Sequence, residues 1–144
     1  MEQIGFEGCF GCGQDNVHGL KATFRDMEDG GVEGVFVAQH HHCGYRDAVH
    51  VGPLVGFISE AMGRLAYRKD MYYLTQSLEV SFLCAVSPGV RIRAFATVRK
   101  NLGHHFTAEA KLFGPAGELI ARAEGRFVTM KRAEVSKCVG GQTG

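Results

Sequence analysis

A carboxylate in the middle of an apolar segment is the first feature of this sequence that could do chemistry. The segment AVHVGPLVGFISEAMG (48–63) places Ser59 and Glu60 side by side within an apolar run. An unpaired carboxylate in a dry core costs free energy or stays protonated. We therefore weigh two roles for Glu60: a chemical role in a cleft that crosses the segment, and an ion pair with Arg64, which follows at position i+4 in the favourable order.

Neighbouring residues offer further candidates. Asp47 lies three residues before His50 and is either a second reactive carboxylate or a loop aspartate that makes a turn. Ser59 can orient a water molecule or serve as a small packing residue. Three consecutive histidines, 40–42, precede Cys43, but consecutive side chains in an extended loop diverge and make a poor metal cage.

The cysteines give no strong prediction of a metal site. The chain has five, an odd number at irregular spacing, which is not a disulfide framework. Cys9 and Cys12 form a C-x-x-C pair with His18 downstream, which is half of a zinc site, and no second pair follows. No strand-helix context follows that would indicate a redox pair. We expect an ordered turn here and no metal.

One helix and six strands are predicted to position these residues. Pro53 fits the first turn of a helix over about 53–68, with Gly52 as its N-cap and a wide apolar face. Alternating or apolar segments separated by turns predict strands over 20–27, 32–38, 72–85, 90–100, 104–114 and 118–131. We expect the last four to form an antiparallel meander, with Val90, Ile92, Ala94, Ala96 and Val98 on one face.

A single helix cannot bury itself, so we predict an α+β fold in which one curved antiparallel sheet of about six strands wraps around it. The domain spans 19–132, between an irregular N-terminal segment, 1–18, and a flexible tail, 133–144. Long strands with open edges favour a homodimer, or a dimer of dimers.

Composition limits the partners. The 144 residues are 45% hydrophobic and 22% charged, with a net charge of +1. That charge gives no footprint for nucleic acid or an anionic membrane. The longest uncharged stretch, 48–59, is too short to span a bilayer, and the N-terminus lacks an apolar signal core, so a cytoplasmic protein is the default.

Three stretches match one family's motifs in order and spacing: CFGCGQDNVHGLKATF (9–24), HCGYRDAVHVGPLVGFISEAMG (42–63) and TQSLEVSFLCAVSPGVRIRAFATV (75–98). They resemble the hotdog-fold acyl-CoA thioesterases, in the PaaI-like and 4-hydroxybenzoyl-CoA thioesterase-like branch. The resemblance implies hydrolysis of an acyl-CoA thioester without metal or cofactor. It also implies an oxyanion bound by N–H groups at the start of the helix and a carboxylate on that helix as base or nucleophile.

Carried onto this chain, the resemblance gives two sets of candidates. The catalytic candidates are Glu60, Ser59, His50, Gly52 and Asp47, and the substrate-binding candidates are His42, Tyr45, Val51 and Thr75. Ser59 occupies the position where the family carries its catalytic carboxylate, and Glu60 follows one residue later, about 100° around the helix. Val51 replaces a glycine, and Pro53 has no N–H to donate.

Three functions follow. The first is an acyl-CoA thioesterase with an altered site. The second is a non-catalytic acyl-CoA-binding protein, because the expected carboxylate is missing. The third is a hotdog dehydratase or hydratase, which ranks last because no strand-borne aspartate–histidine pair is found.

Overall fold

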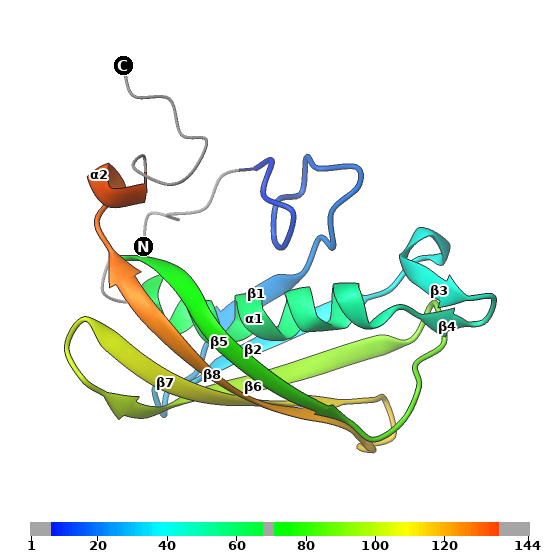
Figure 1. Ribbon diagram of the computed structural model, residues 1–144. Coiled ribbons are helices and arrows are strands. Elements are labelled where there is room, and N and C mark those ends of the chain that lie inside the picture. Colours follow the sequence, from blue (N-terminus) through cyan, green and yellow to red (C-terminus); the bar gives the residue numbers. More distant parts are fainter. Residues whose placement is uncertain (1–6, 68–70, 136–144) are drawn as a thin grey trace.

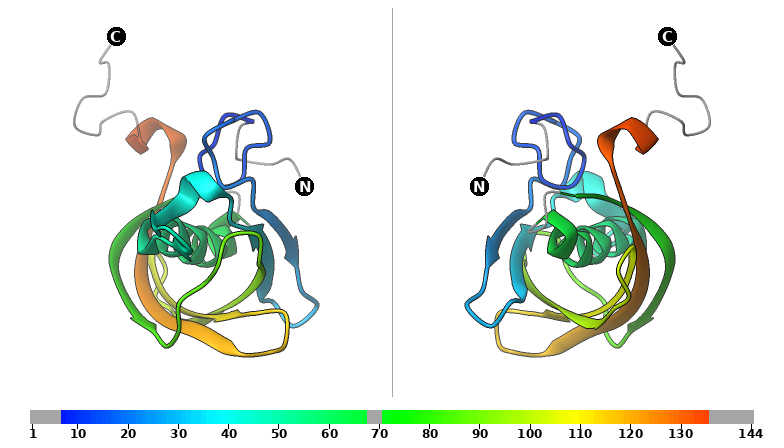
Figure 2. Two further views of the ribbon diagram at one scale, coloured as in Figure 1. Left: turned by 90° about the vertical axis from the view of Figure 1, so that its right-hand side faces the viewer. Right: turned by 90° about the vertical axis from the view of Figure 1, so that its left-hand side faces the viewer.

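A six-stranded antiparallel sheet curves around one long helix in the computed structural model, which describes residues 7–67 and 71–135 (Figures 1 and 2). The helix is α1 (Val51–Tyr67). The sheet contains β1 (Thr23–Asp26), β2 (Val32–Val37), β5 (Tyr72–Phe82), β6 (Arg91–Asn101), β7 (His105–Phe113) and β8 (Leu119–Met130). The predicted fold class is confirmed, including the number of strands around the helix.

The order of the strands corrects the predicted four-strand meander. The order is β1-β2-β6-β7-β8-β5, so β6, β7 and β8 form a meander while β5 pairs with β8 and lies at an edge. The connection over 83–90 carries the chain from that edge to β2, where the N–H of Gly89 donates to the carbonyl oxygen of Ala38 at 2.8 Å. A crossing of this length resembles a hairpin turn in the sequence, because both carry Pro and Gly.

The core lies between α1 and the concave face of the sheet. Phe57, Ile58 and Met62 of the helix are buried against sheet residues such as Phe36 and Phe127. The predicted inward face of β6 is buried at Ile92, Ala94 and Ala96, but the side chain of Val98 is 45% exposed. The pairing register shifts between Val98 and Lys100, which ends the alternation there.

The N-terminal segment covers the side of α1 that the sheet leaves open (Figure 2). Residues 7–18 contain no helix or strand, as predicted. Backbone hydrogen bonds from Leu20 to Phe10, 2.7 Å, and from Ala22 to Gly11, 3.0 Å, tie the segment to the chain that enters β1. Positions 9–12 are thereby held next to the helix.

Four short elements were not predicted. The loop over 39–47 contains a 3₁₀ turn, η1 (His40–His42), and leads into a small hairpin of β3 (Cys43–Tyr45) and β4 (Ala48–Val49). At the other end of the chain, the predicted tail begins with one helical turn, α2 (Arg132–Val135). The rest of that tail, 136–144, and the first six residues lie outside the described residues. No helix within 7–67 or 71–135 is both long and apolar enough to cross a membrane.

Candidate functional site

The start of α1 differs from the prediction in its cap. The helix begins at Val51, so Gly52 lies within the first turn rather than at the N-cap. The Nδ1 atom of His50 accepts a hydrogen bond from the N–H of Gly52 at 2.8 Å. His50 therefore caps the helix and occupies the donor that was predicted to bind an oxyanion. Because Pro53 has no N–H, Val51, which is half exposed, carries the remaining donor of the first turn.

Three other candidates, His42, Tyr45 and Asp47, lie in the loop and small hairpin that precede this helix, and their surroundings differ. His42 is buried, its Nδ1 accepts from the N–H of Gln39 at 3.0 Å, and its carbonyl oxygen accepts from the N–H of His50 at 2.9 Å. Burial, followed by the nearby charge of His41, lowers the pKa of His42, which keeps the ring neutral. His42 therefore supports the hairpin, while the ring of Tyr45 is 85% exposed.

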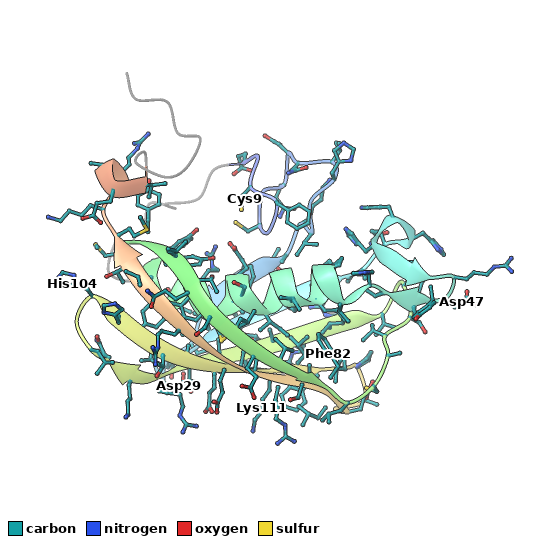
Figure 3. The ribbon with its side chains drawn as sticks, viewed as in Figure 1. Cys9, Asp29, Asp47, Phe82, His104 and Lys111 are labelled. Carbon is teal, nitrogen blue, oxygen red and sulfur yellow. The ribbon has the colours of Figure 1, made fainter. Side chains whose placement is uncertain are left out.

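Asp47 is not brought to the middle of the helix. Its side chain is exposed at the hairpin beyond the start of α1, whereas Cys9 lies above the middle of the helix (Figure 3). It shares no contact with Ser59 or Glu60 among the interactions of the described residues. Asp47 and Glu60 are thus two separate carboxylates, and they do not form a catalytic pair within one chain.

Ser59 and Thr75 meet where α1 packs against β5. Their hydroxyl oxygens, Oγ and Oγ1, lie 3.1 Å apart and share a hydrogen bond. Both side chains are partly buried. The structure therefore joins a predicted catalytic residue and a predicted substrate-binding residue, although the hydroxyl pair provides no carboxylate.

Glu60 lies between the N-terminal segment and β5. Its Oε2 accepts a hydrogen bond from the hydroxyl of Tyr73 at 3.2 Å, while its Oε1 is buried and has no hydrogen-bond partner. A Cβ placed on Gly11 would lie 3.0 Å from the Glu60 Cδ, so the backbone of the segment runs directly over the carboxylate.

Two thiols lie beside the Glu60 carboxylate. The Sγ atoms of Cys9 and Cys12 and a carboxylate oxygen of Glu60 lie within 4.8 Å of one another. Figure 3 shows the Cys9 side chain on the N-terminal segment above α1. Burial, followed by the charge of Glu60, raises the pKa of the Cys12 thiol to about 12. Burial and the same carboxylate also raise the pKa values of Tyr67 and Tyr73. The Cys12 thiol and the two phenols around Glu60 are thus protonated at neutral pH.

The ion pair with Arg64, one of the two roles weighed for Glu60, is not formed. The guanidinium of Arg64 lies over the ring of Phe24, 4.9 Å from its centroid, and over Tyr67 at 5.2 Å. Among the residues described, none forms a salt bridge with Glu60. Stacking on two rings holds the cation away from the carboxylate, and Glu60 keeps no cationic partner there.

The sequence did not reveal that the C-x-x-C pair faces Glu60. The two lie far apart in the chain, and the only local signal was Gly11, which lets the backbone approach the carboxylate. The positions of Tyr67 and Tyr73 beside Glu60 were also missed, because aromatic residues at a helix end and a strand start are typical of an ordinary core.

No protein-family model matches the sequence, and no curated protein matches it. Solved structures do. The PaaI protein of Escherichia coli, from the phenylacetic acid degradation operon, matches with a TM-score of 0.72 at 14% identity, over 78% of this chain and 81% of that protein. A hypothetical thioesterase of Streptococcus pneumoniae, solved with coenzyme A, matches with a TM-score of 0.70 at 13% identity, over 76% of this chain and 85% of that one. A Streptococcus mutans protein bound to acetyl-CoA gives a TM-score of 0.70 at 11% identity, over 76% and 88%.

The fold is therefore the hotdog fold of these structures. PaaI and PaaI-like proteins are among the structures that the chain resembles, as its three motifs predicted.

Proposed function

We propose that this protein binds acyl-CoA and hydrolyses its thioester, with Glu60 as the general base. The observation that carries this proposal is the Oε1 atom of Glu60, a buried carboxylate oxygen with no partner on the central helix of a thioesterase-like fold. Buried polar atoms are nearly always hydrogen-bonded, so such an exception calls for a role. Coenzyme A in two structures of the same fold supports the choice of ligand.

The chemistry assigns one task to the middle of the helix and another to its start. A carboxylate takes a proton from the attacking water, and water adds to the thioester carbonyl. The N–H of Val51, at the positive end of the helix dipole, donates to the carbonyl oxygen as it gains charge. The carbon–sulfur bond then breaks, and coenzyme A leaves as the thiol after it takes up a proton.

One chain cannot complete that site alone. Glu60 follows Val51 by nine residues, which places their backbones about 13 Å apart along the helix. A reacting carbonyl must lie within about 3 Å of both groups. We therefore propose a homodimer in which the helix start of one subunit faces the middle of the partner's helix. The β5 strand supports such pairing, since it is 11 residues long and lies at the edge of the sheet.

A screen of short-chain, long-chain and aromatic acyl-CoAs, with the released thiol measured against an enzyme-only blank, tests the function. We expect Glu60→Gln to lower kcat/KM by about 10²-fold or more. Glu79→Gln, an exposed glutamate on β5, is the matched control and should retain the wild-type rate. An active wild type that is unaffected by Glu60→Gln would remove Glu60 from the mechanism.

A second candidate function is acyl-CoA binding without hydrolysis. The observation that favours it is the hydroxyl pair of Ser59 and Thr75, which provides no carboxylate at the position where the resemblance places one. In that case the wild type binds acyl-CoA in a calorimetric titration and releases no thiol, and Ser59→Asp gains hydrolysis.

The dimer is tested by light scattering or sedimentation at micromolar concentration. A mass of twice 15.7 kDa, or a higher even multiple, is expected. A protein that stays monomeric over that range while it hydrolyses acyl-CoA contradicts the shared site.

A further inference from the structure

Three side chains that can bind a metal form a cluster between the N-terminal segment and α1. They come from two distant parts of the chain, since Cys9 and Cys12 lie in the N-terminal segment and Glu60 lies in the middle of the helix. Their ligand atoms, two thiol sulfurs and one carboxylate oxygen, all lie within 4.8 Å of one another. The sequence contained only half of a site, and the fold supplies the third ligand.

The spacing suits one ion. With metal–sulfur bonds of about 2.3 Å and metal–oxygen bonds of about 2.0–2.2 Å, ligands in a tetrahedral zinc site lie about 3.5–3.8 Å apart. Shifts of about 1 Å in three side chains would close the cluster around an ion. The C-x-x-C spacing is also the one that zinc sites use most often for two neighbouring thiolates.

The backbone already holds the two thiols in place. The N–H of Gly13 donates to the carbonyl oxygen of Cys9 at 2.9 Å and closes a tight turn. A Cβ on Gly13 would lie 2.2 Å from the carbonyl oxygen of Glu7, so the turn leaves no room for a side chain there. Hydrogen bonds from residues 20 and 22 to residues 10 and 11 fix the same turn to the domain.

The carboxylate provides an independent observation. Its Oε1 is buried and accepts no hydrogen bond, which is costly for an ionised oxygen. Its Oε2 is held by the hydroxyl of Tyr73 at 3.2 Å. Metal sites use a hydrogen bond of this kind to orient a carboxylate ligand, which leaves its other oxygen for the metal.

We propose that Cys9, Cys12 and Glu60 bind one thiophilic divalent cation of the zinc type, with a fourth position open to water. Two sulfur ligands favour zinc over magnesium or calcium, which take oxygen ligands. Both thiols lose their protons to the solvent as the ion binds, because the thiolate is the ligand. The proposal replaces the expectation from the sequence that the chain binds no metal, and it does not depend on acyl-CoA hydrolysis.

Direct titration of the full-length protein, reduced and treated with a chelator under anaerobic conditions, tests the site. Zinc is titrated in competition with a chromophoric chelator, and cobalt is added in a parallel series. We expect one equivalent of zinc per chain, together with a sulfur-to-cobalt charge-transfer band and visible bands of tetrahedral intensity. Neither readout requires enzymatic activity.

Variants assign the ligands. Cys9→Ser and Cys12→Ser should each weaken zinc binding by at least ~10²-fold and reduce the charge-transfer band. Glu60→Gln should weaken binding by about 10-fold or more while keeping the band, and Tyr73→Phe by about 10-fold. Cys84→Ser is the matched control and should bind as the wild type does, since Cys84 is an exposed free thiol outside this cluster.

Circular dichroism and thermal unfolding of each metal-free variant separate lost ligands from lost folding. If the cysteine variants fail to fold, Glu60→Gln and Tyr73→Phe carry the test. Absence of stoichiometric zinc, equal binding by Cys12→Ser, or a Cys9–Cys12 disulfide that persists in reductant and excludes zinc would each overturn the proposal.

Discussion

Two carboxylates of this protein are withdrawn from solvent, and their surroundings differ at every contact. Glu33 on β2 has a side chain that is 6% exposed, and it binds the guanidinium groups of Arg25 and Arg93, the latter through Nε at 3.0 Å. Glu60 on α1 receives one phenolic hydrogen bond and is otherwise bordered by thiols and by the backbone of Gly11. Glu33 has all the partners that its charge needs, whereas Glu60 does not.

The pKa of Glu33 reflects that pairing. The hydrogen bond from Arg93 is the largest influence, and together with Arg25 it holds the pKa of Glu33 below its ordinary value in spite of burial. A carboxylate with two cationic partners stabilises a sheet and has little freedom to react. A carboxylate left with an unpartnered oxygen can accept a proton or a metal ion. Glu33 therefore contributes to stability and Glu60 to chemistry, and each prediction below tests that difference.

The largest effect is expected from zinc on hydrolysis. If Glu60 is both the base and a metal ligand, saturating zinc removes the base and should lower kcat/KM by about 10²-fold, to the level of Glu60→Gln. A chelator should restore the rate. Glu33→Gln should respond to zinc as the wild type does, since Glu33 lies on β2 and is not part of the cluster of Cys9, Cys12 and Glu60. A rate that rises with zinc would show that the metal takes part in hydrolysis and that Glu60 is not the free base.

The second prediction concerns the support behind Tyr73. Gly63 of α1 faces that ring so closely that an added Cβ would lie 2.0 Å from Tyr73 Cζ. Gly63→Ala should therefore lower the free energy of unfolding by about 1–3 kcal/mol and weaken zinc binding, because it displaces the hydroxyl that orients Glu60. Urea denaturation and zinc titration measure the two effects.

Gly56→Ala is the control for that change. Its Cβ would meet the nearest atom, Cδ1 of Leu20, at an ordinary 3.5 Å. Alanine in a helix then gains up to about 1 kcal/mol over glycine. Equal losses from both variants would mean that the contact with Tyr73 is not what matters.

The third prediction removes the charge of Glu33. Glu33→Gln should lower the free energy of unfolding by about 1–2 kcal/mol at pH 7, since a buried acceptor of charged donors is weakened while both arginines remain partly exposed. Hydrolysis and zinc affinity should not change. Glu60→Gln should show the reverse pattern, with a small change in stability, and two variants with the same profile would erase the distinction between the two carboxylates.

The smallest effect is the pH dependence of that stability difference. Because the pKa of Glu33 is lower in the folded state, its contribution is fully present above the unfolded pKa of about 4.3 and is lost as the pH falls through the folded value. The difference between wild type and Glu33→Gln should be constant from about pH 6 to 8 and should shrink below about pH 4. Urea denaturation across that range measures it, and a difference that grows in acid contradicts the assigned sign.

Local patterns predicted most of the elements, because alternation and apolar periodicity reflect which face of each element is buried. They predicted a helix that begins two residues from its observed start and strands that match β2 and β6–β8 closely. The pairing of the strands was harder to predict from the sequence, since β5 pairs with β8 through contacts between distant residues that no turn motif encodes. The small hairpin was missed because its two strands are very short and carry little periodicity.

The candidate site divides in the same way. Ser59 and Glu60 were found because polar residues in an apolar helix are conspicuous. Thr75 was found separately, as a substrate-binding candidate, but its contact with Ser59 was not predicted. Tyr73 and the two cysteines were not predicted as neighbours of Glu60, since they reach it only through folding. The ion pair with Arg64, one of two roles weighed for Glu60, rested on spacing alone. In the structure the guanidinium of Arg64 stacks on the rings of Phe24 and Tyr67 instead.

The two cysteines lie early in the chain, so they are synthesised before the residues that surround them in the folded protein. Cys9 and Cys12 are synthesised about 50 residues before Glu60, which at 5–20 residues per second is an interval of about 3 to 10 seconds. Tyr73 follows later still. Throughout that time the dithiol has neither the carboxylate nor the ring that encloses it in the finished fold. Whatever metal ion or oxidant the nascent chain meets first therefore has access to the dithiol before the domain can close over it.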